Sequence, residues 1–330
     1  LTAKLVRARD PLIDLMVRSR VYRYCSFFQV DNIVTAATDP ETGRIFVRKV
    51  PCSRSEVFAS ETLNFREKRV LMQFSERCLS EKRAELSDQT LENEITSHPP
   101  IVFDIIVNAL CMVRPSTPLD QALNRAGRLI KSAGRYGPSP VLVSGYGMSD
   151  ICQGFCRLSA VNGTVYYLNM NIRDLVNEDG SVCMRFETGG VQHEVKADKV
   201  VINAGMRHVH SNKPNVTRCI FLRKGPALLG ESKYSMLFYA EQRPEVYFIE
   251  QEANFDPGLR ILYASCDEPN QQDHIHKIYE ILSQNCDSQT LLSVTYEHVL
   301  PEPMASEGNI HVIQSTSNGA DFFNSDPDFT

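Results

Sequence analysis

The chain has 330 residues, of which 42% are hydrophobic and 23% charged, a composition typical of soluble globular proteins. Its net charge of -5 argues against nucleic acid as a partner, because a nucleic-acid-binding surface needs clustered positive charge. No apolar run is long enough to predict a membrane-spanning helix, and the opening LTAKLVRARD has neither an initiator methionine nor a signal-peptide core. We expect about two domains, and interpret the chain as a fragment of a longer soluble protein.

The first fifty residues predict a helix followed by a β-hairpin. Apolar residues between 5 and 20 are spaced among basic ones, which indicates a helix. From 21 to 50 the apolar residues alternate on both sides of a DPETGR turn, which is typical of two antiparallel strands.

The segment from 61 to 135 has helical periodicity. Asn64 and Glu67 are spaced as a capping box, and Thr117 is placed as an N-cap ahead of Pro118. We expect the main helices at 64–83, 101–113 and 119–133, and a short one at TLENEI. The helix at 101–113 is apolar nearly all round, so it is expected to be buried.

After residue 140 strands dominate, with one further helix at DHIHKIYEILSQ. The expected strands are VLVSGY, GTVYYLNM, IRDLV, SVCMRFE, HEVKA, KVVINA, VTRCIFLRK, YSMLFYA, EVYFIE, LRILYASC, LLSVTYEHVL and NIHVIQS. The predicted fold class is α/β, close to α+β. A discontinuous sheet-rich domain (1–57 and 136–330) surrounds an inserted all-helical domain (58–135).

The block YGMSDICQGFCRLSAVNG (146–163) is predicted to be a polar loop ahead of a strand that begins at RLSA. Its cysteines, Cys152 and Cys156, do not form a CxxC pair, so reduced thiols are favoured over a metal site. The segment ADKVVINAG (197–205) is typical of a flavin-binding sheet, but the glycine-rich turn that holds a dinucleotide pyrophosphate is absent from the chain. A flavin-dependent oxidoreductase therefore remains one alternative.

The same block resembles the most distinctive motif of the Rab escort protein and Rab GDP-dissociation inhibitor family, approximately YG-x-GE-x-PQGF-x-R-x-xA-x-x-GG. The matching residues are Tyr146, Gly147, Gln153, Gly154, Phe155, Arg157, Ala160 and Gly163. Asp150 stands where the family has glutamate, and Cys152 where it has proline. KVPCSRSEVF and LNFREKRVLMQF resemble the segment that enters the family's helical domain, with the escort branch the closer match.

The resemblance implies a flavoprotein-like sheet domain, here without its N-terminal dinucleotide-fold segment, that docks Rab GTPases. The implied Rab-binding residues are Asp150, Gln153 and Arg157, and Tyr167 can add an amphipathic anchor. A surface ion pair and a core aromatic are the alternatives for these side chains. No cofactor and no catalytic residue are expected, because the resemblance implies that the escort branch is an accessory component of a prenylation reaction whose chemistry the transferase performs.

The escort branch also binds the Rab geranylgeranyltransferase α/β heterodimer through its helical domain. The family's aromatic and arginine at this contact fall on Phe58 and Arg69. An exposed aromatic beside an arginine is typical of an interface hot spot. The alternative is that Phe58 is a hydrophobic staple at a helix start.

The third implied partner is the geranylgeranyl lipid of Rab, together with transient contact with a membrane. Phe74, Cys78, Ile106 and Leu110 are candidates to line a lipid groove between the helices. The alternative is that they form the core of the helical segment. A Rab GDP-dissociation inhibitor that never meets the transferase is the second reading within the family.

Overall fold

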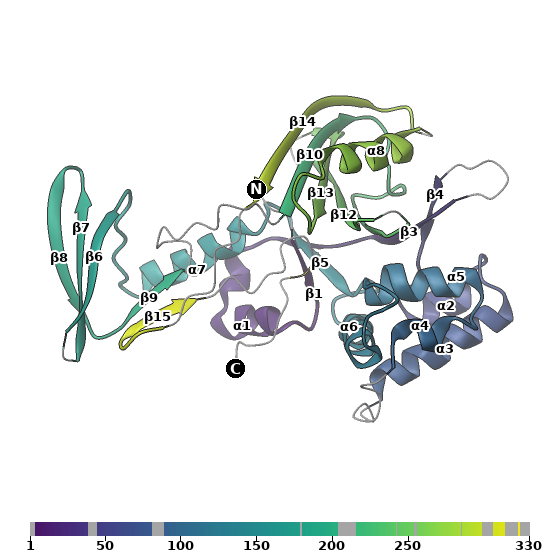
Figure 1. Ribbon diagram of the computed structural model, residues 1–330, viewed down its shortest axis with the longest axis horizontal. Helices are drawn as coiled ribbons and strands as arrows, with labels where there is room; N and C mark the ends of the chain where they lie inside the picture. The colour runs from purple at the N-terminus through teal and green to yellow at the C-terminus, as the bar shows by residue number, and fades with distance from the viewer. Residues whose placement is uncertain are drawn as a thin grey trace.

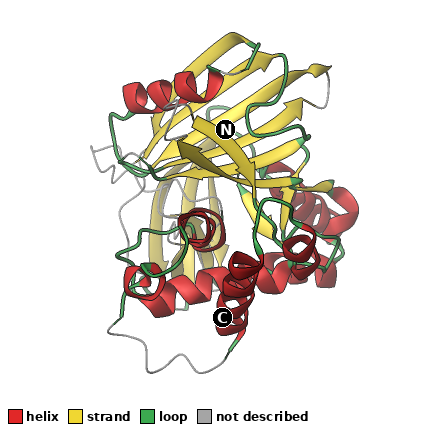
Figure 2. Ribbon diagram, turned by 90° about the vertical axis from the view of Figure 1, so that its right-hand side faces the viewer, coloured by secondary structure: helices red, strands yellow, loops and turns green. Residues whose placement is uncertain are grey.

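The computed structural model is a mixed α/β fold with several sheets (Figures 1 and 2). It describes residues 4–38, 45–80, 89–178, 180–203, 216–241, 243–253, 256–284, 286–298, 306–313 and Phe323. The predicted α/β class is confirmed at this level.

The largest sheet has seven strands, and helix α8 lies against it (Figure 1). In sheet order the strands are β14 (Gln289–His298), β10 (Val216–Lys224), β13 (Asp256–Cys266), β12 (Val246–Ala253), β11 (Tyr234–Tyr239), β3 (Asn32–Thr38) and β4 (Ile45–Lys49). All neighbours are antiparallel except β11 and β3. On α8 (Gln272–Ser283), the Tyr279 ring stacks on Phe221 with centroids 4.1 Å apart.

The predicted hairpin is confirmed by the pairing of β3 with β4, although its turn, residues 39–44, lies outside the described residues. The prediction of one helix over residues 5–20 is wrong at its start. Leu5–Arg7 form strand β1, which pairs with β5 (Val141–Ser144), and β5 also pairs with β2 (Phe27–Gln29). Helix α1 spans Pro11–Ser19. It begins at Pro11 because proline suits the first helical position.

Helices follow one another from Arg54 to Ser132 and gather below the large sheet in Figure 1. They are α2 (Arg54–Ala59), α3 (Phe65–Leu79), α4 (Leu91–Ile95), α5 (Pro100–Asp104), the π-helix η2 (Ile105–Cys111) and α6 (Leu119–Ser132). The Asn64–Glu67 capping box is confirmed, since each side chain bonds the other's backbone N–H. Thr117 is not the N-cap of α6; Pro118 takes that position, one residue later.

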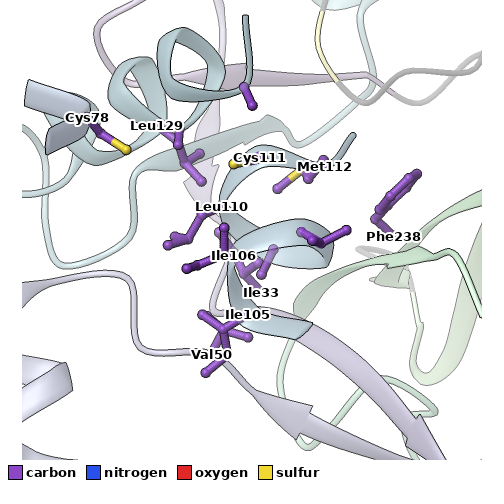
Figure 3. Packing of buried hydrophobic residues seen from close by; sticks show 14 of the residues in the cluster. Ile33, Val50, Cys78, Ile105, Ile106, Leu110, Cys111, Met112, Leu129 and Phe238 are labelled. Atoms are coloured by element: carbon purple, nitrogen blue, oxygen red, sulfur yellow. The ribbon is translucent and has the colours of Figure 1, made fainter. Parts of the chain in front are cut away.

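A single buried cluster joins these helices to the seven-stranded sheet. Figure 3 shows Ile105 and Ile106 of η2 beside Ile33 of β3, with Phe238 of β11 further along the same cluster. Ile105 and Ile106 are at most 1% exposed. The predicted burial of the helix at 101–113 is therefore confirmed, and the helical segment is fixed to the sheet by shared apolar contacts.

Two smaller sheets lie beyond α7, at the left of Figure 1. One is antiparallel, with β6 (Asn171–Glu178), β7 (Ser181–Thr188) and β8 (Val191–Ala197); the other pairs β9 (Val200–Asn203) with β15 (Ile310–Ile313) in parallel. The prediction of a strand at GTVYYLNM is wrong, because residues 164–170 carry no strand. Residues 204 and 205 of the ADKVVINAG segment lie outside the described residues.

Candidate partner-binding surfaces

The motif block folds as a helix, α7 (Ser149–Val161), which corrects the prediction of a loop followed by an RLSA strand. Gly147 precedes the helix with φ +85°, and Gly163 follows it with φ +89°. Both values fall in the left-handed region, where glycine is favoured because it has no Cβ. Gly147 and Gly163 therefore mark the two ends of the helix, and the block's third glycine, Gly154, lies within it.

Asp150, Gln153 and Arg157 lie on one side of α7, since they are separated by three and four positions. Seven residues of helix place Asp150 and Arg157 about 10 Å apart along the axis. Gln153 and Arg157 are exposed, and Asp150 is half-buried. The structure thus brings together three of the four predicted Rab-binding residues as one polar stripe.

The Asp150 carboxylate also holds α7 against the neighbouring sheet. Its Oδ2 accepts hydrogen bonds from the Ser26 backbone N–H at 3.3 Å and from Ser144 Oγ at 3.4 Å. The Cys25 thiol donates to the Asp150 carbonyl at 3.5 Å, and burial together with the nearby carboxylate raises the pKa of that thiol. Asp150 is therefore a positioning residue as well as a candidate contact.

Arg157 and Gly154 show how closely α7 approaches the short 3₁₀ helix η1 (Val21–Tyr24). The Arg157 guanidinium lies 4.9 Å from the centroid of the Tyr24 ring, a cation–π distance. A Cβ on Gly154 would stand 2.9 Å from both Cys25 Sγ and Val21 Cγ1. The glycine is therefore needed for this contact, which aligns Arg157 along an aromatic face.

Tyr167 lies in the extended segment after α7, with 53% of its surface exposed. Its ring packs edge-on against Phe186 of β7, with the ring centroids 5.3 Å apart, so one part of the side chain is packed and the rest is exposed to solvent. The surrounding residues Val161, Val165, Tyr166 and Leu168 are also exposed. The sequence prediction missed this apolar surface, because a strand at GTVYYLNM would have turned every second side chain inward.

Phe58 is the last residue but one of α2 and is 67% exposed, and Arg69 is exposed on α3. Leu63 occupies the position ahead of the Asn64 N-cap and is buried, so the geometry gives the staple position to Leu63. Lys68 Nζ donates to the Phe58 carbonyl at 2.9 Å, which joins the end of α2 to α3.

Phe65 was not selected from the sequence, yet it is 84% exposed. It is the first residue of α3 and lies one turn before Arg69 on the same side of the helix. Its position in the sequence lies off the apolar stripe of Leu71, Phe74 and Cys78, which is the only local indication that it could be exposed.

A cavity of about 460 Å³ lies between α2, α3, η2 and α6. Leu110, one of the four predicted lipid-groove residues, lines it together with Leu71, Ile105 and Ile130. Phe74, Cys78 and Ile106 are instead packed in the core, with at most 3% of each exposed (Figure 3 shows Cys78 and Ile106). The apolar cavity, rather than the faces of the helices as a whole, is the candidate lipid site.

Within the described part of the chain, no helix is long and apolar enough to cross a membrane. No group of three or more His, Cys, Asp or Glu side chains in the same residues could hold a metal ion.

Comparison with known sequences identifies a family that matches most of this chain. The family described as GDP dissociation inhibitor matches residues 1–238. The Rab proteins geranylgeranyltransferase component A of Drosophila melanogaster is 30% identical over 241 residues, which are 68% of this chain and 45% of that protein. Component A 2 of Homo sapiens is 32% identical over 188 residues, or 53% of this chain and 27% of that protein. The chain thus spans less than half the length of these curated relatives.

Two solved structures share the fold. A Rab GDI from Plasmodium falciparum superposes with a TM-score of 0.74 at 18% identity, covering 97% of this chain and 78% of that one. An oxidoreductase from Methanosarcina mazei gives a TM-score of 0.61 at 12% identity, covering 94% and 82%. At such identities the likeness shows the fold alone, and that fold serves proteins of different function.

The described part of the chain has the architecture shared by a Rab GDI and an oxidoreductase, and α7 presents the polar side chains of Gln153 and Arg157 at its surface. Because the family match covers more than half of the 330 residues and includes α7, α2 and α3, the chain belongs to the GDP dissociation inhibitor family.

Proposed function

We propose that this protein is a Rab escort protein, the accessory component of Rab geranylgeranyltransferase, and that it performs no bond chemistry itself. The observation that carries the proposal is the family match over residues 1–238, which contains both candidate binding surfaces. The relatives named component A of the transferase support the escort branch.

The α7 stripe is the proposed Rab-binding surface. Gln153 and Arg157 are exposed on a helix whose start is held by Asp150, so their positions are fixed before a partner arrives. The Arg157 guanidinium can bind a carboxylate of the partner through two parallel hydrogen bonds. Because the helix is already ordered, binding costs little conformational entropy. Tyr167 lies outside this stripe, in the segment after α7, and is proposed as an additional exposed aromatic contact.

The α2–α3 surface, defined by Phe58, Phe65 and Arg69, is the proposed site for the transferase α/β heterodimer. Two aromatics that are 67% and 84% exposed beside an arginine are uncommon on a solvated surface. They have the composition of a hot spot, in which a few aromatic and arginine side chains supply most of the binding free energy.

The apolar cavity beside Leu110 is the proposed entry for the geranylgeranyl chain. Burial gains about 0.8 kcal/mol for each CH₂ group, so even part of the chain would be held well. Phe74, Cys78 and Ile106 are buried in the same core cluster as the cavity-lining Leu71, Ile105 and Leu110, and would line a groove only if α3 and η2 separate. The segment 58–135 is accordingly proposed as a domain for transferase and lipid, and 1–57 with 136–330 as the Rab-binding domain. Transient membrane contact would accompany delivery of the lipidated Rab.

A reconstituted prenylation assay tests the proposal. The protein is mixed with unprenylated GDP-bound Rab, the transferase heterodimer and a labelled prenyl donor, and transfer of label to Rab is measured. We expect transfer only when the protein is present. Absence of transfer, with binding of prenylated Rab preserved, would favour the dissociation-inhibitor function instead.

A further inference from the structure

A second cavity, of about 430 Å³, lies between α1 and α6 and is lined entirely by charged side chains. These are Arg9, Asp10, Asp14, Arg128, Lys131 and Arg135. Four cations and two carboxylates leave an excess of positive charge, in a protein whose net charge is -5. The cavity is separate from the α7 stripe, the α2–α3 surface and the apolar cavity.

Both carboxylates of this cavity already have partners. Asp10 Oδ1 accepts from Arg7 Nε at 3.0 Å and from Arg128 Nη2 at 3.2 Å, while its Oδ2 accepts from the Arg7 backbone N–H at 3.1 Å. Asp14 Oδ1 accepts from Arg135 Nη2 at 2.6 Å. Asp10 is therefore shared between two arginines, and it cannot neutralise a third cation.

Arg9 and Lys131 supply the excess charge. Both are exposed, and no carboxylate among the described residues forms an ion pair with either. The Arg9 backbone N–H donates to Ser132 Oγ at 3.2 Å, which holds the turn before α1 against the end of α6. The N-terminus of α1 and the C-terminus of α6 meet here, so their opposite dipoles offset each other and the side chains decide the sign of the field.

We propose that this cavity binds a phosphate-bearing anion, such as a diphosphate or a phosphorylated headgroup. Arginine guanidinium groups bind phosphate oxygens through paired hydrogen bonds, and lysine adds a mobile point charge. The ion pairs of Asp10 and Asp14 hold Arg128 and Arg135 in place, so the site is organised before the anion enters. The negative charge of the bound anion neutralises the positive charges of Arg9 and Lys131, so the role of these two residues is to bind the anion.

Isothermal titration calorimetry with inorganic pyrophosphate at low ionic strength tests the site. The test variant joins Arg9→Gln with Lys131→Gln, which removes two charges and leaves the Asp10 and Asp14 ion pairs intact. The control joins Lys224→Gln with Lys277→Gln, two exposed lysines elsewhere that give the same change in net charge. We expect the test variant to bind pyrophosphate about tenfold more weakly or worse, and the control to bind like the parent.

A sedimentation assay separates the two sources of the anion. Phosphatidylcholine vesicles are compared with the same vesicles containing a phosphatidylinositol phosphate. Binding to the second kind alone, lost in the Arg9/Lys131 variant, assigns the site to a lipid headgroup; pyrophosphate binding without vesicle binding assigns it to a soluble ligand. The proposal is overturned if the parent binds neither, or if the control variant weakens binding as much as the test variant. Neither variant touches the Rab or transferase surfaces, so this failure is distinct from failure of the escort function.

Discussion

The α7 stripe and the α2–α3 surface, the two proposed partner-binding surfaces, are held by the fold in different ways. On α7, Asp150 bonds Ser26 and Ser144, and Arg157 lies on Tyr24, so the same side chains position the helix and face solvent. On α2 and α3, Phe58 and Phe65 are largely exposed and the core is formed by other residues. Mutations on α7 should therefore lower stability to different degrees, most at the packed contact of Gly154 and least at the exposed contact of Arg157, whereas mutations on α2–α3 should change binding alone.

The largest effect is expected from Phe58→Ala on the α2–α3 surface. Truncating a hot-spot aromatic costs about 2–4 kcal/mol, so affinity for the transferase heterodimer should fall by about a hundredfold. The melting temperature should not change, because the side chain is 67% exposed. Fluorescence titration of the heterodimer and a thermal melt measure the two quantities.

Leu291→Ala is the matched control, since Leu291 is an exposed apolar residue of β14, 46% exposed and far along the chain from α2. It should leave transferase affinity unchanged. If Phe58→Ala also has no effect while prenylation proceeds, the transferase contact lies elsewhere on the protein.

Gly154→Ala should give the largest loss of stability on α7. An alanine Cβ would meet Cys25 Sγ and Val21 Cγ1 at 2.9 Å, and such overpacking costs about 1–3 kcal/mol. In an exposed helix the same change would raise stability by up to about 1 kcal/mol, so the sign of the effect tests the close approach. Urea denaturation gives the free energy of unfolding, and Ser159→Ala on the same helix should stay within about 0.5 kcal/mol.

Arg157→Ala should weaken Rab binding by about tenfold, as expected for loss of a charge-assisted contact at an interface. Stability should change little, because the exposed cation–π contact with Tyr24 is worth about 0.5–1 kcal/mol. Arg173→Ala on β6 is the control, as that arginine is 59% exposed and paired with Glu187. Equal Rab affinity for both variants would remove Arg157 from the proposed contact.

The sequence predicted those elements whose signals are local. The Asn64–Glu67 box and the β3–β4 hairpin are specified by adjacent residues, and both were found. The α7 helix was missed although Ile151, Phe155 and Leu158 are spaced as one helical stripe, because Gly154 lies within that stripe and a glycine in sequence indicates a turn. Strand β1 was missed because its partner, β5, lies more than a hundred residues later.

The candidate surfaces also divide into features that the sequence predicts and features that depend on contacts between distant segments. Family resemblance selected Asp150, Arg157 and Phe58, but the second role of Asp150 depends on Ser26 and Ser144, which only the folded chain brings near. The exposure of Phe65 depends on which side of α3 packs inward. Contacts between distant segments are the part that periodicity and capping cannot supply.

The smallest effect is expected from Arg114→Ala, which tests whether the α7 stripe and the α2–α3 surface are mechanically coupled. Arg114, just after η2, forms two hydrogen bonds of 2.7 Å with Glu245, just before β12, and so ties the helical segment to the seven-stranded sheet. Burial raises the pKa of Glu245, but the bonds from Arg114 outweigh it and hold that pKa below the usual 4.5. A carboxyl with a lowered folded pKa adds stability above its unfolded pKa, and this stability is lost as the pH falls through the folded value.

Arg114→Ala should therefore lower the free energy of unfolding by about 0.5–1 kcal/mol at neutral pH, as a well-aligned surface pair does. The difference from the parent should shrink as the pH falls below 4.5, where protonation of Glu245 removes the pair in the parent, which the variant already lacks. Arg54→Ala is the control, because its pair with Glu76 is longer, at 3.7 Å, and both side chains are more than 60% exposed. If Arg114→Ala also weakens Rab binding, the tie transmits between the helical segment and the sheet. If Rab affinity is unchanged, the shared apolar core of Ile33, Ile105 and Phe238 is enough to hold the two surfaces in register.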